Sequence, residues 1–276
     1  MNPSVHPHHR RHLRPAVRRV LTVTVVACIA VGGASFVLHS RSAMPAASAT
    51  STSSASAASE AESSLLTARQ AQAILDDPRM VLVNHTNKMP DDHTFTTKVC
   101  GSATAVNKTL QTVACNAFLE LQKAAAAENV TVWMQSGYRS VSYQTNLYEK
   151  KTNYYKQQGY DDAKAKEMAA AVVNPPGYSE HNCGLAADLN SPEHTGLDEG
   201  FENTAAFRWL CQHAVEYGFI LRYPKEAESV TGITYEPWHW RYVGPENAAL
   251  IQQSGLCFED AVAVLQKLAA GEKITG

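Results

Sequence analysis

Two short segments, far apart along the chain, constrain its fold most strongly, because their polar side chains form one chemical set only if the fold brings them together. The first segment is 179–188 and the second is 235–242. Their candidate functional side chains are His181, Asp188, Glu236 and His239. Any architecture for this chain must therefore place these two segments side by side.

This set of side chains has a specific chemical meaning. Two imidazoles and one carboxylate can supply the three protein ligands of a catalytic zinc site, which keeps a further position open for water or substrate. We therefore expect His181, Asp188 and His239 to bind Zn2+, with Glu236 as the general base. Each residue alone would be ordinary, since single histidines and glutamates are mostly surface or hydrogen-bonded residues.

The local sequence of the first segment favours this arrangement. Gly184 interrupts the chain after His181, and residues 185–189 then alternate as a short strand. His181 is therefore expected on the turn that leads into the strand, where it can face Asp188.

The second segment needs an irregular backbone. Glu236 and His239 are three residues apart, and a regular strand would point them to opposite faces. Pro237 cannot donate to a strand ladder, so we expect the strand to begin only after it. Both side chains can then point into one cleft, with Arg241 on the same strand face as His239.

The two segments resemble a known family. Ser179-x-His181-x-x-Gly184-x-Ala186-x-Asp188 and Glu236-x-Trp238-His239 are similar to the SxHxxGxAxD and ExWH signatures of the VanY-type zinc D-alanyl-D-alanine carboxypeptidases. This group also includes lysostaphin-like peptidases and the hedgehog fold. The stretch from Ser136 to Gln144 resembles the SGYRSxxxQ segment of the family, and further similarity extends over residues 81–268.

The resemblance implies the fold, the substrate and further site residues. It implies an α+β domain with a small antiparallel sheet flanked by helices, and peptidoglycan stem peptides as the substrate. It places Arg139 in the cleft, where a guanidinium would stabilise the oxyanion or bind the terminal carboxylate of the substrate. Gln144 and Ser179 match positions associated with substrate binding.

Several functions share these motifs. A D,D-carboxypeptidase removes the fifth-position D-alanine, an L,D-carboxypeptidase removes the fourth, and an endopeptidase cuts cross-bridges. A noncatalytic, zinc-stabilised wall-binding module is the alternative outside enzymes. Such a module needs neither Glu236 nor Arg139, and the presence of both favours a metallopeptidase.

The N-terminal residues predict a membrane anchor. Residues 1–19 contain five arginines and no acidic side chain, and residues 20–38 form an apolar run close to the roughly 20 residues that span a bilayer. We expect an uncleaved, single-pass signal anchor with a cytoplasmic basic arm and an extracytoplasmic catalytic domain. Cleavage near residues 46–49, or lipidation at Cys28, would also place the catalytic domain outside the cytoplasm.

Residues 39–64 are dominated by Ser, Ala and Thr, a composition that cannot bury enough apolar surface to order itself. We expect a flexible linker there, followed by one domain over residues 65–276. That domain carries 18 Lys and Arg against 24 Asp and Glu, a net charge of −6, which argues against a nucleic-acid partner. Nothing in the sequence specifies an oligomeric state.

Five cysteines follow the apolar run, and their spacing does not determine how they pair. Cys183 lies within the first segment, but it occupies a variable position of the motif, and the ligand set is complete without it.

Periodicity and turn signals predict the secondary structure. Helices are expected at 68–75, 109–129, 141–158, 161–172, 204–217, 245–254 and 258–270, and strands at 131–135, 185–189, 219–223 and 238–243. In the second helix, the expected buried stripe consists of Val113, Phe118, Leu119 and Leu121.

Overall fold

The computed structural model describes residues 66–101 and 108–272. The expected basic arm, signal anchor and linker lie outside the described residues. Among those described, no single helix has the length and apolar character to cross a membrane. The adjoining helices 245–254 and 258–269, bent by 96° at their junction, meet that criterion only as a pair, and on length and composition alone.

The helices follow the sequence prediction closely. They are α2 (Ala68–Leu75), α3 (Thr112–Ala127), α4 (Val141–Gln157), α5 (Asp162–Ala170), α6 (Ala205–His213), α7 (Glu228–Thr231), α8 (Pro245–Ser254) and α9 (Phe258–Ala269). Side-chain caps begin several of them: Thr67, Ser140, Asp161 and Thr204 each accept a backbone N–H from the first turn. The short helix α7 was not predicted.

Five 3-10 turns lie between these elements, η1 (Pro78–Met80), η2 (Glu180–Cys183), η3 (Glu199–Asn203), η4 (Ala214–Tyr217) and η5 (Lys225–Ala227). η4 directly follows α6, so the single helix expected over 204–217 changes to a tighter turn at Ala214. Gly218 then ends η4 in the left-handed conformation.

A four-stranded antiparallel sheet forms the centre of the fold. Its strands are β3 (Trp133–Ser136), β4 (Ala186–Asn190), β5 (Phe219–Leu221) and β6 (His239–Tyr242), in the spatial order β3-β4-β6-β5. A separate two-stranded sheet pairs β1 (Thr97–Val99) with β2 (Thr109–Gln111). The predicted α+β class with a small antiparallel sheet is confirmed.

One helix boundary was predicted wrongly. Residues 109–111 form β2, and α3 begins only at Thr112. Val113 was assigned to the buried stripe of this helix but is 49% exposed, whereas Ala114, Cys115, Phe118 and Leu121 are buried. Pairing of β2 with β1 and the disulfide at Cys115 set the rotation of α3, and neither was predicted.

The two faces of the central sheet have different roles. On one face, Leu189, Phe219 and Trp240 pack into an apolar core with α3 and α6. Because side chains alternate along a strand, Asp188 and His239 emerge on the other face. The sheet therefore carries the core on one side and the candidate functional side chains on the other.

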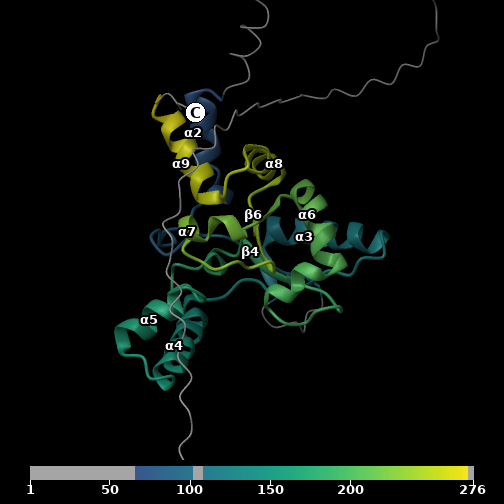
Figure 1. Ribbon diagram of the computed structural model, residues 1–276. Coiled ribbons are helices and arrows are strands. Elements are labelled where there is room, and N and C mark those ends of the chain that lie inside the picture. Colours follow the sequence, from purple (N-terminus) through teal and green to yellow (C-terminus); the bar gives the residue numbers. More distant parts are fainter. Residues whose placement is uncertain (1–65, 102–107, 273–276) are drawn as a thin grey trace, which may run out of the picture.

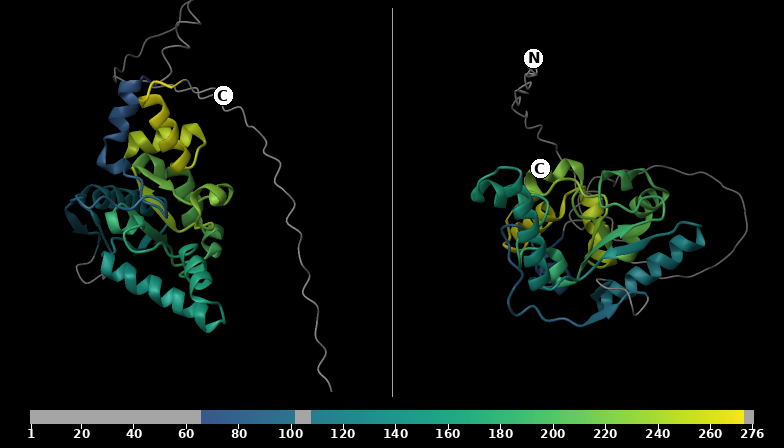
Figure 2. Two further views of the ribbon diagram at one scale, coloured as in Figure 1. Left: turned by 90° about the vertical axis from the view of Figure 1, so that its left-hand side faces the viewer. Right: turned by 90° about the horizontal axis from the view of Figure 1, so that it is seen from below.

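The remaining helices cover the two ends of the molecule. Figure 1 shows α2 and α9 together at one end and the α4–α5 hairpin at the other, with the central strands between them, and Figure 2 shows the same arrangement from the side. A second apolar core joins α2, α8 and α9 to Ile220 and Val243 of the sheet region.

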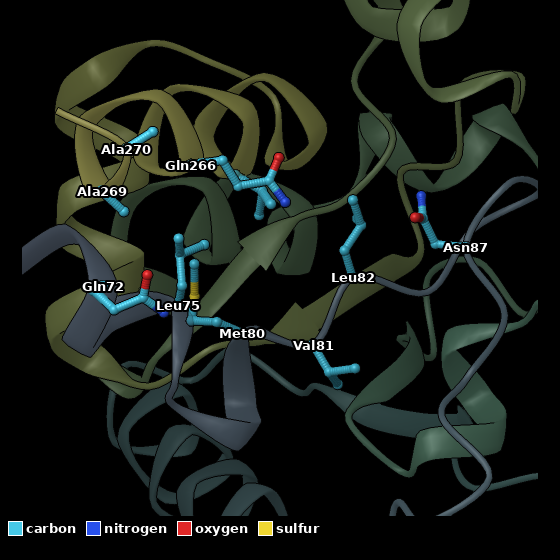
Figure 3. A pocket seen from close by; sticks show the side chains of 10 residues that line it. Gln72, Leu75, Met80, Val81, Leu82, Asn87, Gln266, Ala269 and Ala270 are labelled. Carbon is cyan, nitrogen blue, oxygen red and sulfur yellow. The ribbon is translucent and has the colours of Figure 1, made fainter. Parts of the chain in front are cut away.

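A groove lies between α2, α9 and the segment 80–87 (Figure 3), at the end of the molecule opposite the α4–α5 hairpin (Figure 1). Leu75, Met80, Val81 and Leu82 contribute its apolar lining, and Gln72, Asn87 and Gln266 contribute amides. It shares no lining residue with the cleft that contains His181 and His239.

The structure resolves the pairing of the cysteines within the described residues. Cys100 and Cys115 form a disulfide that ties the end of β1 to the first turn of α3. Cys183, Cys211 and Cys257 are free thiols.

Candidate active site

The register of the sheet brings Asp188 and His239 together. The two residues are directly opposite each other on the antiparallel strands β4 and β6. Side chains of such a pair share one face of the sheet, and Asp188 Oδ1 lies 3.4 Å from Nδ1 of His239. Two segments distant in sequence thus converge through ordinary strand pairing.

His181 reaches the same point from η2. Gly184 ends this turn at φ 70°, and a Cβ atom there would lie 3.1 Å from the Phe95 ring and 3.2 Å from the backbone nitrogen of Gln111. Glycine is therefore favoured both by conformation and by packing. Nε2 of His181 lies 3.2 Å from Asp188 Oδ1, as expected for a histidine on the turn before the strand.

A backbone contact orients the His181 ring. Its Nδ1 lies 2.7 Å from the carbonyl oxygen of Gly137, so this nitrogen carries the proton and Nε2 is free as a metal ligand. Position 137 is restricted to glycine, because a Cβ atom there would lie 2.4 Å from the carbonyl oxygen of Thr109.

The three expected ligands form one compact group. One donor atom from each of His181, Asp188 and His239 lies within 4.8 Å of the others, and all three residues are buried. Two imidazole nitrogens and one carboxylate oxygen are donors that Zn2+ accepts in a site with an open position. The residues present therefore fit the metal that the motif implies.

Glu236 lies beside this group without belonging to it. The His239 backbone N–H donates to the Glu236 carbonyl oxygen, forming a turn across Pro237, and this turn points both side chains to one side. Glu236 Oε2 is 3.4 Å from His239 Nδ1, and its side chain is 12% exposed. The expected irregular backbone before β6 is confirmed.

Arg139 lies at the cleft and contacts the metal-ligand set directly. Its guanidinium donates to Oδ2 of Asp188 through Nη2 and to the hydroxyl of Ser136 through Nε. Its backbone N–H donates to the carbonyl oxygen of His181. In the structure, Arg139 thus orients Asp188 in addition to lining the cleft.

Gln144 and Ser179 also line the cleft, and both are buried. The Gln144 side-chain amide donates to the carbonyl oxygen of Asn174, while its Oε1 has no hydrogen-bond partner among the described residues. Ser179 directly precedes η2, but its hydroxyl does not cap that turn. The structure places both near the ligands, and their substrate-binding roles stay predictions.

Other residues of the cleft were not predicted from the sequence. Asn174 and Tyr223 line it and are buried, and each has a side-chain oxygen without a hydrogen-bond partner in the part of the chain that the structure describes. Polar atoms at such positions in a cleft can bind water or the polar groups of a ligand.

The charges around the site shift the pKa values of its members in opposite directions. Burial lowers the pKa of His181 to about 4, with Arg139 acting in the same direction. For His239, burial is outweighed by Asp188, Glu180 and Glu236, which raise its pKa to about 10. Burial raises the pKa of Glu236, whereas for Asp188 burial is outweighed by His181 and Arg139, and its pKa lies well below the usual range.

Cys183 does not join the ligand group. Its buried thiol donates to the carbonyl oxygen of Glu180, and burial raises its pKa. A thiolate nucleophile or ligand requires a lowered pKa, so the geometry agrees with the prediction that left Cys183 out.

Comparison with known proteins agrees with this geometry. The family described as VanY, D-alanyl-D-alanine carboxypeptidase, matches residues 107–245, a range that contains all the candidate site residues. The chain is 31% identical over 264 residues to the D-alanyl-D-alanine carboxypeptidase of Enterococcus faecalis, covering 92% of this chain and 94% of that protein. The chain belongs to the VanY family.

Solved VanY-type structures share the fold. A vancomycin-resistance D,D-pentapeptidase VanY, solved in complex with Zn(II), is 33% identical with a TM-score of 0.58, covering 67% of this chain and 99% of that one. The LD-carboxypeptidase LdcB is 31% identical with a TM-score of 0.59, covering 71% and 88%. The VanY fold thus accounts for most of the described residues.

Proposed function

We propose that this VanY-family chain is a zinc metallocarboxypeptidase that removes the C-terminal D-alanine from peptidoglycan stem peptides. The observation that carries the proposal is the buried donor group of His181, Asp188 and His239, which lies in a cleft together with Glu236 and Arg139. The names of its relatives support the substrate, and the VanY relative solved with Zn(II) supports the metal.

The metal would be held by His181 Nε2, a carboxylate oxygen of Asp188 and His239 Nδ1. When bound, zinc polarises the scissile carbonyl and lowers the pKa of water toward ~7. Glu236 is placed to accept the proton of the attacking water and to pass it to the leaving amine. Its raised pKa, caused by burial, suits a group that both accepts and donates a proton.

The other cleft residues bind and orient the substrate. Arg139 supplies a cation next to Asp188, where it stabilises negative charge that develops on the scissile carbonyl or binds the terminal carboxylate. Gln144, Asn174 and Ser179 are close enough to the ligand group to line the same cleft. The unpaired amide oxygens of Gln144 and Asn174 can accept hydrogen bonds from the N–H groups of a stem peptide.

The two structural relatives differ in the bond that their names imply. One is a D,D-pentapeptidase and the other an LD-carboxypeptidase, and their TM-scores to this chain are nearly equal. Removal of C-terminal D-alanine is common to both activities. The fold therefore supports removal of a C-terminal D-alanine. An assay on tetra- and pentapeptide stems distinguishes the two activities.

The test is incubation of the zinc-loaded chain with defined muropeptide tetra- and pentapeptides, followed by mass spectrometry. We expect loss of one alanine from at least one of them. Loss only from the pentapeptide identifies D,D-specificity, and loss only from the tetrapeptide identifies L,D-specificity. In a parallel incubation with cross-linked dimers, cleavage of the dimers alone would instead identify an endopeptidase. Peptide binding, measured separately, without any product would favour a noncatalytic wall-binding module.

A further inference from the structure

Glu180 lies behind the ligand group, on the far edge of the His239 ring. Its side chain is fully buried, and its Oε2 is 3.5 Å from Nε2 of His239. Neither atom has a hydrogen-bond partner within the described part of the chain. The other ring nitrogen, Nδ1, faces Asp188 and Glu236. The ring therefore lies between the metal-binding side and one additional carboxylate.

Two buried arginines fix the orientation of Glu180. Its Oε1 accepts hydrogen bonds from Arg222 Nε at 2.8 Å and from Arg241 Nη1 at 2.7 Å, and both arginine side chains are 0% exposed. Arg222 is held in turn by Glu259 of α9, and Arg241 donates to the backbone carbonyl of Val81. One oxygen of Glu180 is thus fully engaged, and the other is aimed at His239.

We propose that Glu180 is a positioning residue that holds His239 with its proton on Nε2 and leaves Nδ1 free to bind zinc. This inference rests on the proposed zinc site. Metal-binding histidines usually donate their second ring N–H to a carboxylate or a carbonyl, which fixes the tautomer and the ring orientation. The carbonyl of Gly137 does this for His181, and Glu180 is the matching group for His239.

The arginines make Glu180→Gln an informative substitution. Arg222 and Arg241 are both donors, so the amide oxygen must stay on their side and the NH2 group must face Nε2 of His239. A donor in that place favours the opposite tautomer, with the proton on Nδ1. We expect the zinc affinity of the full chain, measured by competition with a chelator, to fall by about 10–100-fold.

Glu259→Gln is the matched control. It removes a carboxylate from the same arginine cluster but does not contact His239. We expect both variants to lower the melting temperature and only Glu180→Gln to weaken zinc binding. Equal loss of zinc affinity in both variants, or unchanged affinity in folded Glu180→Gln, would overturn the proposal.

A second measurement does not depend on whether the variant folds. In the zinc-loaded parent labelled with 15N-histidine, a long-range 1H–15N spectrum should show His239 protonated on Nε2, and a proton on Nδ1 would overturn the proposal. A parent that binds zinc but releases no D-alanine contradicts the proposed activity and leaves the role of Glu180 standing. A parent that binds no zinc overturns the metal site itself.

Discussion

At the scale of single residues, geometry separates the proposed metal ligands from the groups around them. The ligand atoms of His181, Asp188 and His239 converge, whereas Glu236 lies to one side and Arg139 contacts the outer oxygen of Asp188. Substitutions should therefore divide into those that remove the metal and those that leave it bound.

His181→Ala, Asp188→Ala and His239→Ala should each lose zinc and D-alanine release together, because each removes one of three protein ligands. Zinc content by atomic emission and product formation by mass spectrometry check this. His194→Ala is the control, since His194 lies outside the ligand group and contacts Asp198. Any of the three variants that keeps stoichiometric zinc and full activity would exclude that residue as a ligand.

Glu236→Gln should keep the zinc and lose turnover by roughly 10²–10⁴-fold, the usual contribution of a general base. The amide has nearly the shape of the carboxylate but cannot accept the proton. Zinc content, stem-peptide affinity and D-alanine release are measured on the same preparation, with the exposed Glu226→Gln as control. Unchanged turnover would reject Glu236 as the base.

At the scale of elements, short irregular segments position the site more than the long helices do. His181 and Glu180 lie on the turn η2, and Glu236 lies on the turn before β6. These segments depend on a few backbone contacts, so conservative changes within them should affect metal binding.

Gly184→Ala should destabilise the fold by more than the ~1–2 kcal/mol that a left-handed conformation costs an L-residue, because the added methyl also meets Phe95 and Gln111. Gly255→Ala is the matched control: the φ of Gly255 is 67°, and no atom of residues 66–101 or 108–272 lies within 4 Å of an added Cβ. Thermal denaturation and zinc affinity are measured on both. Equal effects on stability would show that packing around Gly184 contributes nothing.

Asp77 joins η1 to α8 and provides a pH-dependent contribution to stability. Its carboxylate accepts a hydrogen bond from the backbone N–H of Arg79 and forms a salt bridge with the Arg79 guanidinium. It also accepts a hydrogen bond from the side-chain amide of Asn247. Burial alone would raise its pKa, but these contacts outweigh burial and lower it. Because the folded-state pKa is lower than the unfolded one, the stabilisation is present above the ordinary aspartate value of about 4 and is lost as the pH falls through the lowered pKa.

Asp77→Asn should therefore lower the free energy of unfolding by about 1–3 kcal/mol at pH 7. Urea denaturation at pH 7 and near pH 3 measures the difference from the parent. We expect the difference to shrink at the lower pH, and a constant difference across this range would contradict the electrostatic account.

At the scale of the whole molecule, buried charges connect the end of the fold formed by α2 and α9 to the site. Glu259 of α9 pairs with Arg222, and Arg222 pairs with Glu180 next to the ligand group. Such a buried network is costly to break by removing one partner. The network therefore ties α9 to the residues behind the ligand group, and we expect its loss to lower the stability of the fold.

The full chain should be held at the membrane with its catalytic domain outside the cytoplasm. Five arginines before the apolar residues 20–38 predict this orientation. Protease added to intact cells should digest the domain and leave residues 1–19 protected, and deletion of residues 1–38 should remove the protein from the membrane fraction. Complete protection of the domain in intact cells would refute the orientation.

The sequence by itself predicted the order of the elements and the group of His181, Asp188 and His239 that the structure brings together. A local turn and the strand after it connect His181 to Asp188, and a local turn connects Glu236 to His239. The spacing within each short segment was therefore enough to predict the relative positions of the two side chains in it. Caps and proline or glycine stops likewise act within a few residues, which is why α2 and α8 were predicted with their observed bounds.

The tertiary structure decided everything that depends on contacts between distant segments. The sequence around Glu180 does not indicate that this side chain lies behind His239 and is held there by two buried arginines. Those arginines come from distant parts of the chain, β6 and the segment after β5. The rotation of α3, which exposes Val113, follows from strand pairing and from the Cys100–Cys115 bond. Asn174 lines the cleft, where its carbonyl oxygen accepts a hydrogen bond from Gln144 of α4, 30 residues earlier in the chain. Burial and charge pairing are properties of the assembled fold, and spacing along the chain does not encode them.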